Sequence, residues 1–187
     1  MKPEMPMEQA LIALLEENDR FMRDLELVRS LRLPDGHIAA GYIRNQAWDR
    51  LHGFKAGERH ADIDVVFYDP ADRSERRDEA AERQLREMTG DPKWSVKNQA
   101  RMHIRNGDAP YDSLSDALSR WPETATAVGA RLDDNGRITL VHPYGLADLF
   151  GLVVRRSPAF ADGAYYLDRI RKKGWSKLWP LLSIIEQ

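Results

Sequence analysis

Two carboxylates alternate at the start of an apolar run in the middle of the chain. The segment Asp62-Ile63-Asp64-Val65-Val66-Phe67-Tyr68 has the β-branched and aromatic composition of a buried strand. Because successive strand residues point to opposite faces, Asp62 and Asp64 are expected to project from the same side. Two carboxylates on one face can share a divalent cation, which can neutralise phosphate charge. The pair therefore predicts a metal site for phosphoryl chemistry, and a surface pair at a strand end is the alternative interpretation.

A glycine turn upstream supplies a second element for such a site. His37 to Gly41 is a short apolar run that ends in glycine, and Tyr42 to Leu51 has helical spacing. We expect a strand, a tight turn and a helix, with Gly41 near Asp62 and Asp64. A glycine at a strand end lets backbone amides approach a phosphate, and the helix start adds a favourable dipole. A plain tight turn is the alternative interpretation of Gly41.

The rest of the chain alternates between helical and strand patterns. These patterns predict one or two helices from Met7 to about Ser30, a strand from Ile63 to Tyr68, a helix from Ser74 to Met88, a strand from Trp94 to Lys97, a helix from Ser113 to Ser119, a hairpin of Thr124 to Leu132 with Arg137 to Val141, helices from Tyr144 to Val154 and Tyr165 to Lys173, and a last apolar segment from Trp175 to Ile185. Asn98 to Ile104 stays open between strand and helix.

This order predicts an α+β fold, with a small mixed sheet flanked by helices, an N-terminal helix and a C-terminal helical segment. The length fits a single domain over residues 1–187, with a core at about 31–142 and a helical appendage at about 143–187.

The composition limits the ligands and the partners. The chain has no cysteine, so a metal must be bound by oxygen or histidine, which favours magnesium or manganese. The net charge of -2 gives no general attraction to polyanions, and this makes a small molecule or a protein a more attractive partner than a long RNA, without excluding tRNA. No apolar run approaches the length of a membrane span, so we expect a cytoplasmic protein.

Five blocks of sequence carry a resemblance to a known family. They are Gly41-Tyr42-Ile43-Arg44-Asn45, Asp62-Ile63-Asp64-Val65, Val96-Lys97-Asn98-Gln99-Ala100-Arg101-Met102-His103, Trp121-Pro122-Glu123-Thr124-Ala125-Thr126-Ala127-Val128-Gly129 and Gly145-Leu146-Ala147-Asp148-Leu149-Phe150. Together these blocks resemble a family of bacterial nucleotidyltransferase-like proteins in the DNA polymerase β superfamily. The signature of that superfamily is a glycine-serine turn, an acid-x-acid strand and a third acid on a later strand.

The resemblance implies transfer of a nucleoside monophosphate from a nucleoside triphosphate to an acceptor hydroxyl, with release of pyrophosphate. It implies that Asp62 and Asp64 are the catalytic carboxylates and bind one or two Mg²⁺ or Mn²⁺ ions. It also implies that Gly41, Arg44 and Asn45 bind the phosphates of the nucleotide. Positioning and charge neutralisation supply most of the catalysis in such phosphoryl transfers. The acceptor is not identified by the resemblance.

The chain departs from the superfamily pattern in two places. Tyr42 stands where serine usually follows the glycine, so one phosphate contact is missing or comes from Asn45. The strand at Trp94 has Lys97 or Asn98 where the third acid is expected. Asn98 is a candidate for the third position or for substrate contact, because its amide could offer a neutral oxygen, but it lacks the charge that attracts a second cation. Either the site holds one metal or another acid substitutes, and the candidates are Asp69, Asp91 and Glu123.

Three further residues are candidates for the third position or for substrate contact. Arg101, His103 and Glu123 lie within the family blocks, but each also has a structural interpretation as a hydrogen-bonded or ion-paired residue. A basic group in the C-terminal part could bind a polyanionic acceptor or simply end helices and keep the surface charged. Its members are Arg155, Arg156, Arg169, Arg171, Lys172, Lys173 and Lys177.

Three hypotheses on function follow from these observations. The first is a metal-dependent nucleotidyltransferase that acts on a nucleoside triphosphate and an unidentified hydroxyl acceptor. The second is a catalytically degenerate module of the same fold that binds a nucleotide or a partner, and the missing third acid favours it. The third is a metal-dependent phosphohydrolase that uses the same acidic pair.

Overall fold

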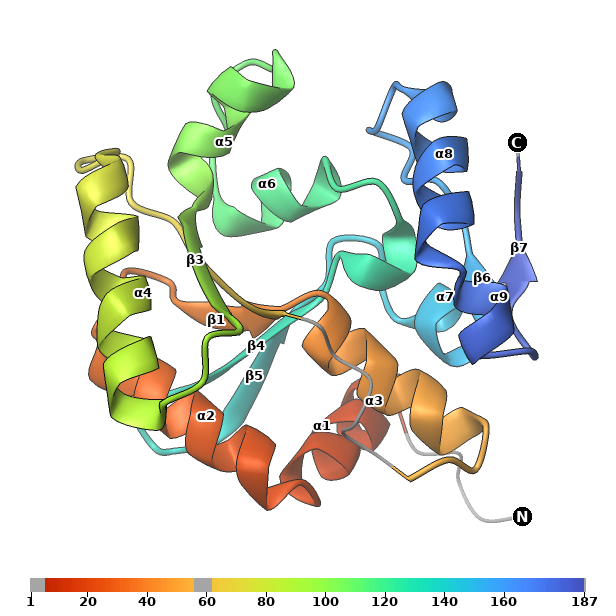
Figure 1. Cartoon of the computed structure of the whole chain (residues 1–187), viewed down its shortest axis with the longest axis horizontal. Helices are drawn as coiled ribbons and strands as arrows, with labels where there is room; N and C mark the ends of the chain where they lie inside the picture. The colour runs from red at the N-terminus through yellow and green to blue at the C-terminus, as the bar shows by residue number, and fades with distance from the viewer. Residues whose placement is uncertain (1–5, 56–61, 187) are drawn as a thin grey trace.

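A five-stranded mixed sheet lies at the centre of the protein, with the strand order β3-β2-β1-β4-β5 (Figure 1). Its strands are β1 (His37–Ala39), β2 (Ile63–Phe67), β3 (Trp94–Asn98), β4 (Gly129–Leu132) and β5 (Ile138–Val141). Strands β2 and β3 run parallel, and the other neighbouring pairs are antiparallel. The structure is a computed structural model that describes residues 6–55 and 62–186.

Helices pack on both faces of this sheet, and a small second sheet lies in the C-terminal region. The helices are α1 (Met7–Glu16), α2 (Asp19–Ser30), α3 (Gly41–Leu51), α4 (Glu75–Thr89), α5 (Gln99–Asn106), α6 (Leu114–Ser119), α7 (Ala147–Phe150), α8 (Gly163–Lys173) and α9 (Trp175–Leu178), with a 3-10 helix η1 at Thr124–Thr126. Strands β6 (Val153–Val154) and β7 (Ser183–Ile184) pair in parallel. Over residues 6–55 and 62–186, none of the helices has the length and hydropathy that crossing a bilayer requires.

The two faces of β2 differ in character, and this difference sets where polar chemistry can occur. One face carries Ile63, Val65 and Phe67 into the main hydrophobic core, together with side chains of α1 to α4. On the other face, Val66 packs in a smaller apolar cluster with residues of α6. Asp64 shares the face of Val66 because strand side chains alternate. The sheet thus buries one face in the core and leaves the start of β2 on the other face to polar groups.

The register of the sheet sets the neighbours of Asp64. It lies opposite Ala39 of the antiparallel strand β1 and beside Ser95 of the parallel strand β3. Because β1 ends at Ala39, the turn into α3 lies next to the acidic pair. The sequence predicted that the turn and the acidic pair lie next to each other.

The predicted α+β fold with a small mixed sheet is confirmed. The N-terminal helical pattern forms two helices, separated where the side chain of Asn18 accepts hydrogen bonds from the backbone N–H groups of Arg20 and Phe21. The segment that the sequence left open after β3 is helical, because Asn98 caps α5 by accepting a hydrogen bond from the N–H of Ala100.

The expected helix from Tyr144 to Val154 is wrong. Only the single turn α7 forms, after which Leu152 adopts a positive φ of 56° and the chain enters β6. The Tyr166 hydroxyl lies 2.7 Å from the carbonyl oxygen of Ile185 and 3.1 Å from that of Val154, so its single O–H is shared between the chain segments of β7 and β6. The first arm of the expected hairpin is also shorter than predicted, since η1 precedes β4.

A buried histidine at the start of β1 makes stability depend on pH. The His37 ring is 3% exposed and donates from Nδ1 to the carbonyl of Asp35 at 2.8 Å. Burial lowers its pKa below the ordinary 6.5, against the opposing effect of Asp35. The unfolded chain therefore takes up this proton first as the pH falls below 6.5, and the native state loses stability.

We expect the free energy of unfolding to fall below pH 6.5 with a contribution from His37 of at most about 1.4 kcal/mol per pH unit. The His37→Asn variant keeps an N–H donor for Asp35 but does not titrate, so it lacks this contribution. Urea unfolding of both proteins between pH 5 and 7.5 measures the difference. Parallel pH profiles for the two proteins would show that His37 does not contribute.

Candidate functional site

The acidic pair lies at the entry to β2. Asp62 is exposed and directly precedes the strand, whereas Asp64 is half-buried within it. Burial raises the pKa of Asp64, and the charge of Asp62 raises it further; Lys173, Arg44 and Arg169 act in the opposite direction. Residues 56–61, which precede the pair, lie outside the described residues. The pair is thus a site of unfavourable negative charge that a bound cation would relieve.

The turn beside the acids has a strained backbone, but the strain lies at Ala40 instead of Gly41. Ala40 has φ 58° and ψ -129°, which glycine adopts far more readily than alanine. Gly41 is the first residue of α3 and has no positive φ. A Cβ atom on Gly41 would lie 3.5 Å from Nη2 of Arg44, an ordinary contact. Neither backbone conformation nor internal packing therefore requires glycine at position 41.

The Ala40→Gly variant should be more stable than the natural chain. Relief of the strain, less the entropy cost of glycine, should raise the free energy of unfolding by about 1 kcal/mol. Ala40 is 8% exposed but belongs to neither of the two apolar clusters, so the variant loses only the contacts of one methyl group. Chemical denaturation measures the change. A loss of stability of the size typical for glycine in a helix, about 1 kcal/mol, would contradict the strain.

Arg44 is buried in the first turns of α3 and does not face solvent. Its guanidinium donates to Oγ1 of Thr126 at 2.7 Å and to Oδ1 of Asn45 at 2.9 Å. It also lies between two indole rings, 4.7 Å from the centroid of Trp48 and 4.3 Å from that of Trp175. Burial lowers the pKa of Arg44 to about 10, so the group stays charged at neutral pH. Arg44 thus adds positive charge behind the turn instead of reaching out from it.

Glu123 is fully buried and forms an ion pair with α8. Its Oε1 atom accepts a hydrogen bond from Nε of Arg169 at 2.6 Å, and its charge opposes the fall in the pKa of Arg44. The residue bridges across to Arg156 through the backbone. From the sequence, Glu123 was a candidate for the third acid or for a substrate contact. The structure places it as the counter-ion of two buried or half-buried arginines.

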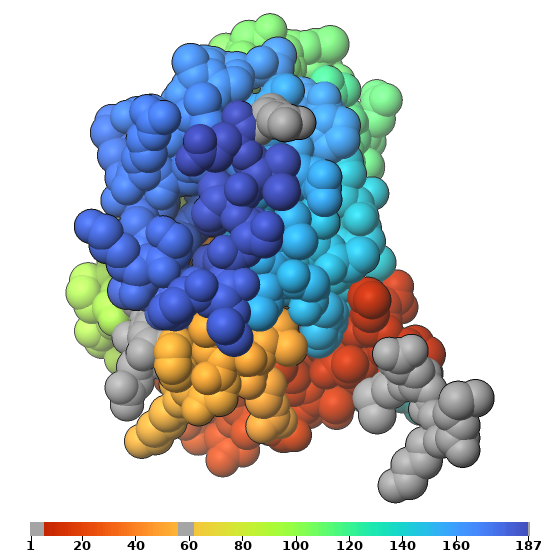
Figure 2. Space-filling model, turned by 90° about the vertical axis from the view of Figure 1, so that its right-hand side faces the viewer, coloured from red at the N-terminus to blue at the C-terminus, as the bar shows by residue number. Residues whose placement is uncertain are grey.

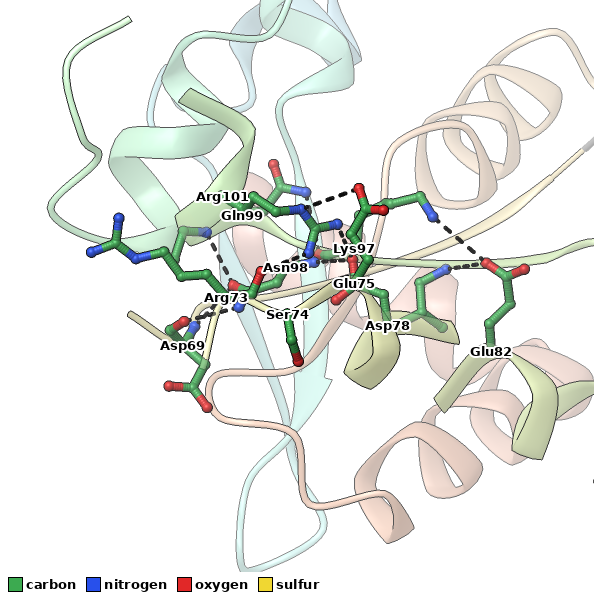
Figure 3. Close-up of polar contacts among 12 residues, drawn as sticks. Asp69, Arg73, Ser74, Glu75, Asp78, Glu82, Lys97, Asn98, Gln99 and Arg101 are labelled. Atoms are coloured by element: carbon green, nitrogen blue, oxygen red, sulfur yellow. Dashed lines mark hydrogen bonds and ion pairs between the residues drawn. The ribbon is translucent and has the colours of Figure 1, made fainter. Parts of the chain in front are cut away.

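Asn98 and Arg101 lie in a separate polar network between β3, α4 and α5 (Figure 3). The amide of Asn98 is 0% exposed; it donates to the carbonyls of Asp69 and Asp72, both at 2.9 Å. In register, Asn98 stands beside Phe67, so its side chain points to the face opposite Asp64. This orientation is the wrong one for a third metal ligand beside Asp64.

Arg101 and His103 of α5, the candidates for substrate contact, bind other groups of the protein. Arg101 donates from Nη2 to Oδ2 of the buried Asp78 at 2.6 Å (Figure 3). The ring of His103 is buried, with Nδ1 3.0 Å from the carbonyl of Ala100 and an edge contact to Tyr111. The structure thus gives both residues the structural interpretation that the sequence left open.

The register places a serine, not an acid, beside Asp64 on β3. Ser95 is the neighbour of Asp64, and the described parts of the chain contain no group of three histidine or acidic side chains that could hold a metal. Asp69 accepts hydrogen bonds from the N–H groups of Ala71 and Asp72 and pairs with an arginine of α4. Asp91 pairs with Arg20 at 2.7 Å. Neither acid substitutes at the site.

The sequence grouped the basic residues of the C-terminal part but could not single out those near the acids. Arg169 and Lys173, four residues apart on one face of α8, both act on the pKa of Asp64. Trp175 of α9 lies against Arg44. In the sequence, the i, i+4 spacing of Arg169 and Lys173 was the one signal that they share a face of α8. No sequence signal indicated that Trp175 lies against Arg44, because these residues are far apart in the chain.

The comparisons with known proteins agree with this architecture. A sequence model of a family described as nucleotidyltransferase matches residues 26–184. The fold is similar to that of a protein whose NMR structure reveals a CCA-adding enzyme head domain, with a TM-score of 0.84 and 35% identity over 96% of each chain. The search of curated proteins found no match.

Larger enzymes share the fold at lower identity. A CCA-adding enzyme in complex with CTP has a TM-score of 0.57 and 15% identity, over 99% of this chain and 44% of that one. An apo form of a CCA-adding enzyme has a TM-score of 0.55 and 16% identity, over 92% of this chain and 42% of that one. This chain therefore spans less than half of the length of these two enzymes. Since the family model spans most of the chain and the similar head domain matches nearly all of it, this protein belongs to the nucleotidyltransferase family.

Proposed function

We propose that this nucleotidyltransferase transfers a nucleoside monophosphate from a nucleoside triphosphate to an acceptor hydroxyl, in a reaction that depends on Mg²⁺ or Mn²⁺ and releases pyrophosphate. The observation that carries the proposal is the register of β2 against β1, which sets Asp64 opposite Ala39, at the turn into α3. An acidic pair and the positive end of a helix thus meet, as binding of a metal and a triphosphate requires.

Asp62 and Asp64 would hold the cation. Two carboxylates are a suitable donor set for a hard divalent ion, and their mutual repulsion is part of why the pKa of Asp64 is raised. A bound cation would polarise the α-phosphate and neutralise charge on the departing pyrophosphate. Oxygens of the triphosphate would complete its coordination.

The turn and the start of α3 would bind the phosphates. Gly41 fits this role because no internal contact or backbone angle requires glycine there, whereas close approach of a phosphate to the backbone would. Arg44 would contribute its charge from behind the turn, since its guanidinium is held by Thr126 and Asn45. Asn45 would therefore act through Arg44 as well as on the nucleotide.

The acceptor is a hydroxyl whose carrier we leave open, with a small molecule or a protein favoured over a long RNA because the net charge is -2. The fold that this chain shares with a CTP-bound CCA-adding enzyme supports a nucleoside triphosphate as the donor.

A labelling experiment tests this function. The protein is incubated with each nucleoside triphosphate labelled at the α-phosphate, Mg²⁺, and separate small-molecule, protein and RNA fractions of a cell extract. The proposal expects label in one fraction, an equal amount of pyrophosphate, and loss of both with a chelator. Release of inorganic phosphate instead would favour a phosphohydrolase.

A catalytically degenerate binding module is the second candidate. Ser95 at the position beside Asp64 favours it, because a neutral hydroxyl does not supply the charge of a third carboxylate. Nucleotide binding that depends on Mg²⁺ but gives neither labelled acceptor nor pyrophosphate, with every nucleotide and every fraction, would identify this function.

A further inference from the structure

The guanidinium of Arg169 is fixed at one edge and open at the other. Its Nε atom donates to Oε1 of Glu123 at 2.6 Å, and the side chain is 25% exposed. Within residues 6–55 and 62–186, no hydrogen-bond partner meets the Nη1 or Nη2 atom of Arg169. A guanidinium with two free amino groups in one plane matches two oxygens of a phosphate. Arg169 therefore presents a phosphate-binding fork at the surface.

Glu123 holds this fork in one orientation. The carboxylate is 0% exposed, and its second oxygen, Oε2, has no hydrogen-bond partner. The backbone of Glu123 is fixed as well, because its carbonyl accepts a hydrogen bond from the N–H of Thr126 at 3.1 Å. A buried, immobile carboxylate costs free energy unless a cation compensates it. Arg169 is therefore bound tightly through Nε, with little freedom left to its planar group.

The fork lies close to the start of α3. The ring of Trp175 has the guanidinium of Arg44 at 4.3 Å from its centroid and that of Arg169 at 5.9 Å. Arg44 in turn approaches Gly41, with Nη2 3.5 Å from where a Cβ atom would be. Arg169 and Arg44 thus share one indole ring as neighbour, and burial and then the charge of Arg169 lower the pKa of Arg44, so Arg169 lies on the side of the protein where α3 begins.

The C-terminal segment that carries the fork is firmly attached to α3. Figure 2 shows this segment, in blue, resting directly on α3, in orange. Trp179 donates from Nε1 to Oδ1 of Asp49 at 2.8 Å, and its ring packs edge-on against Trp48. A rigid attachment keeps a charged group in place before the ligand arrives, which lowers the cost of binding.

We propose that Arg169 is a triphosphate-binding residue of this enzyme and that Glu123 is its positioning residue. The inference rests on the proposed function, since the triphosphate is that of the nucleotide donor. Arg44 supplies charge from behind the turn, and Arg169 supplies the hydrogen bonds from the open side. Lys173, one turn further along α8 and exposed, adds charge on the same face.

Calorimetric titration with inorganic tripolyphosphate and with a non-hydrolysable nucleoside triphosphate, both with Mg²⁺, tests the inference. We expect Arg169→Gln to weaken binding of both ligands by about 10–100-fold, as loss of charge-assisted hydrogen bonds would. Glu123→Gln should weaken it less, by about 3–10-fold, since the fork remains but is held less firmly. The control is Arg171→Gln, which removes the same charge from an exposed position of the same helix.

Salt dependence separates a binding role from a structural one. A charge that contacts the ligand makes affinity fall with ionic strength, so Arg169→Gln should flatten this dependence more than Arg171→Gln does. If Arg169→Gln does not fold, the double variant Glu123→Gln with Arg169→Gln, which removes both charges, is measured instead. Binding by the natural chain that Arg169→Gln changes no more than the control overturns this inference alone. No binding by the natural chain overturns the proposed function as well.

Discussion

Replacing Asp64 by asparagine is expected to slow nucleotidyl transfer by on the order of 10³-fold, because the cation that we propose Asp64 to hold would be worth several kcal/mol to the transition state. The amide keeps the shape of the carboxylate but loses the charge that attracts the cation. The rate of pyrophosphate release at saturating nucleotide and Mg²⁺ measures the effect, once an acceptor has been found by labelling.

The same substitution should not destabilise the protein in the absence of metal. Burial and the charge of Asp62 both disfavour the ionised form of Asp64, so a neutral amide removes a cost and should raise the melting temperature slightly. Asp134→Asn, at an exposed position in the turn between β4 and β5, is the matched control and should leave both quantities unchanged. If Asp64→Asn retains more than about a tenth of the rate, a metal-holding role is contradicted. Asp64 would then contribute at most about 1.4 kcal/mol to stabilisation of the transition state.

Replacing Asp78 by alanine is expected to lower the free energy of unfolding by about 3–5 kcal/mol, because the change leaves the mostly buried guanidinium of Arg101 without its close ion-pair partner. The Asp78 carboxylate is 1% exposed; its Oδ2 accepts from Nη2 of Arg101 at 2.6 Å and from the N–H of Asn98 at 3.1 Å (Figure 3). Urea or guanidinium unfolding measures the loss.

Glu75 provides the control for this effect. It is the more distant partner of Arg101, at 3.8 Å, and its side chain is 76% exposed, so Glu75→Ala should cost less than about 1 kcal/mol. Equal losses for the two variants would contradict the buried network. A large loss for Asp78→Ala alone would support a structural role for Arg101, as opposed to the substrate contact that its place in the family blocks suggested.

Local patterns predicted much of the fold because they act over a few residues. The β-branched run at Ile63 to Phe67 and the charged run from Glu75 to Thr89 fold as their composition indicates. Strands β6 and β7 escaped prediction because each has two residues, and they pair with each other across about 30 intervening positions, with Tyr166 in contact with the carbonyls of Val154 and Ile185. A pairing held by distant contacts leaves no periodic signal in the sequence.

In the candidate site, too, local spacing was predictable from the sequence and contacts between distant residues were not. The spacing of Asp62 and Asp64, with a glycine turn before them, predicted that the turn and the acids are neighbours. The sequence could not show that Ser95, not Asn98, stands beside Asp64, since the register of β2 and β3 is set across the whole of α4. It also could not pair Glu123 with Arg169, which lie 46 positions apart.

The melting temperature with Mg²⁺ and a non-hydrolysable nucleoside triphosphate tests the metal and nucleotide site most directly. At about 100 times the dissociation constant, a ligand that binds only the native state adds about 2.7 kcal/mol, or roughly 5–10 °C for a chain of this size. We predict this rise for the natural chain only when metal and nucleotide are both present, and its loss when Asp62 and Asp64 are both replaced by alanine. An unchanged melting temperature with every nucleotide, or an undiminished rise in the double variant, would contradict the assignment of the site.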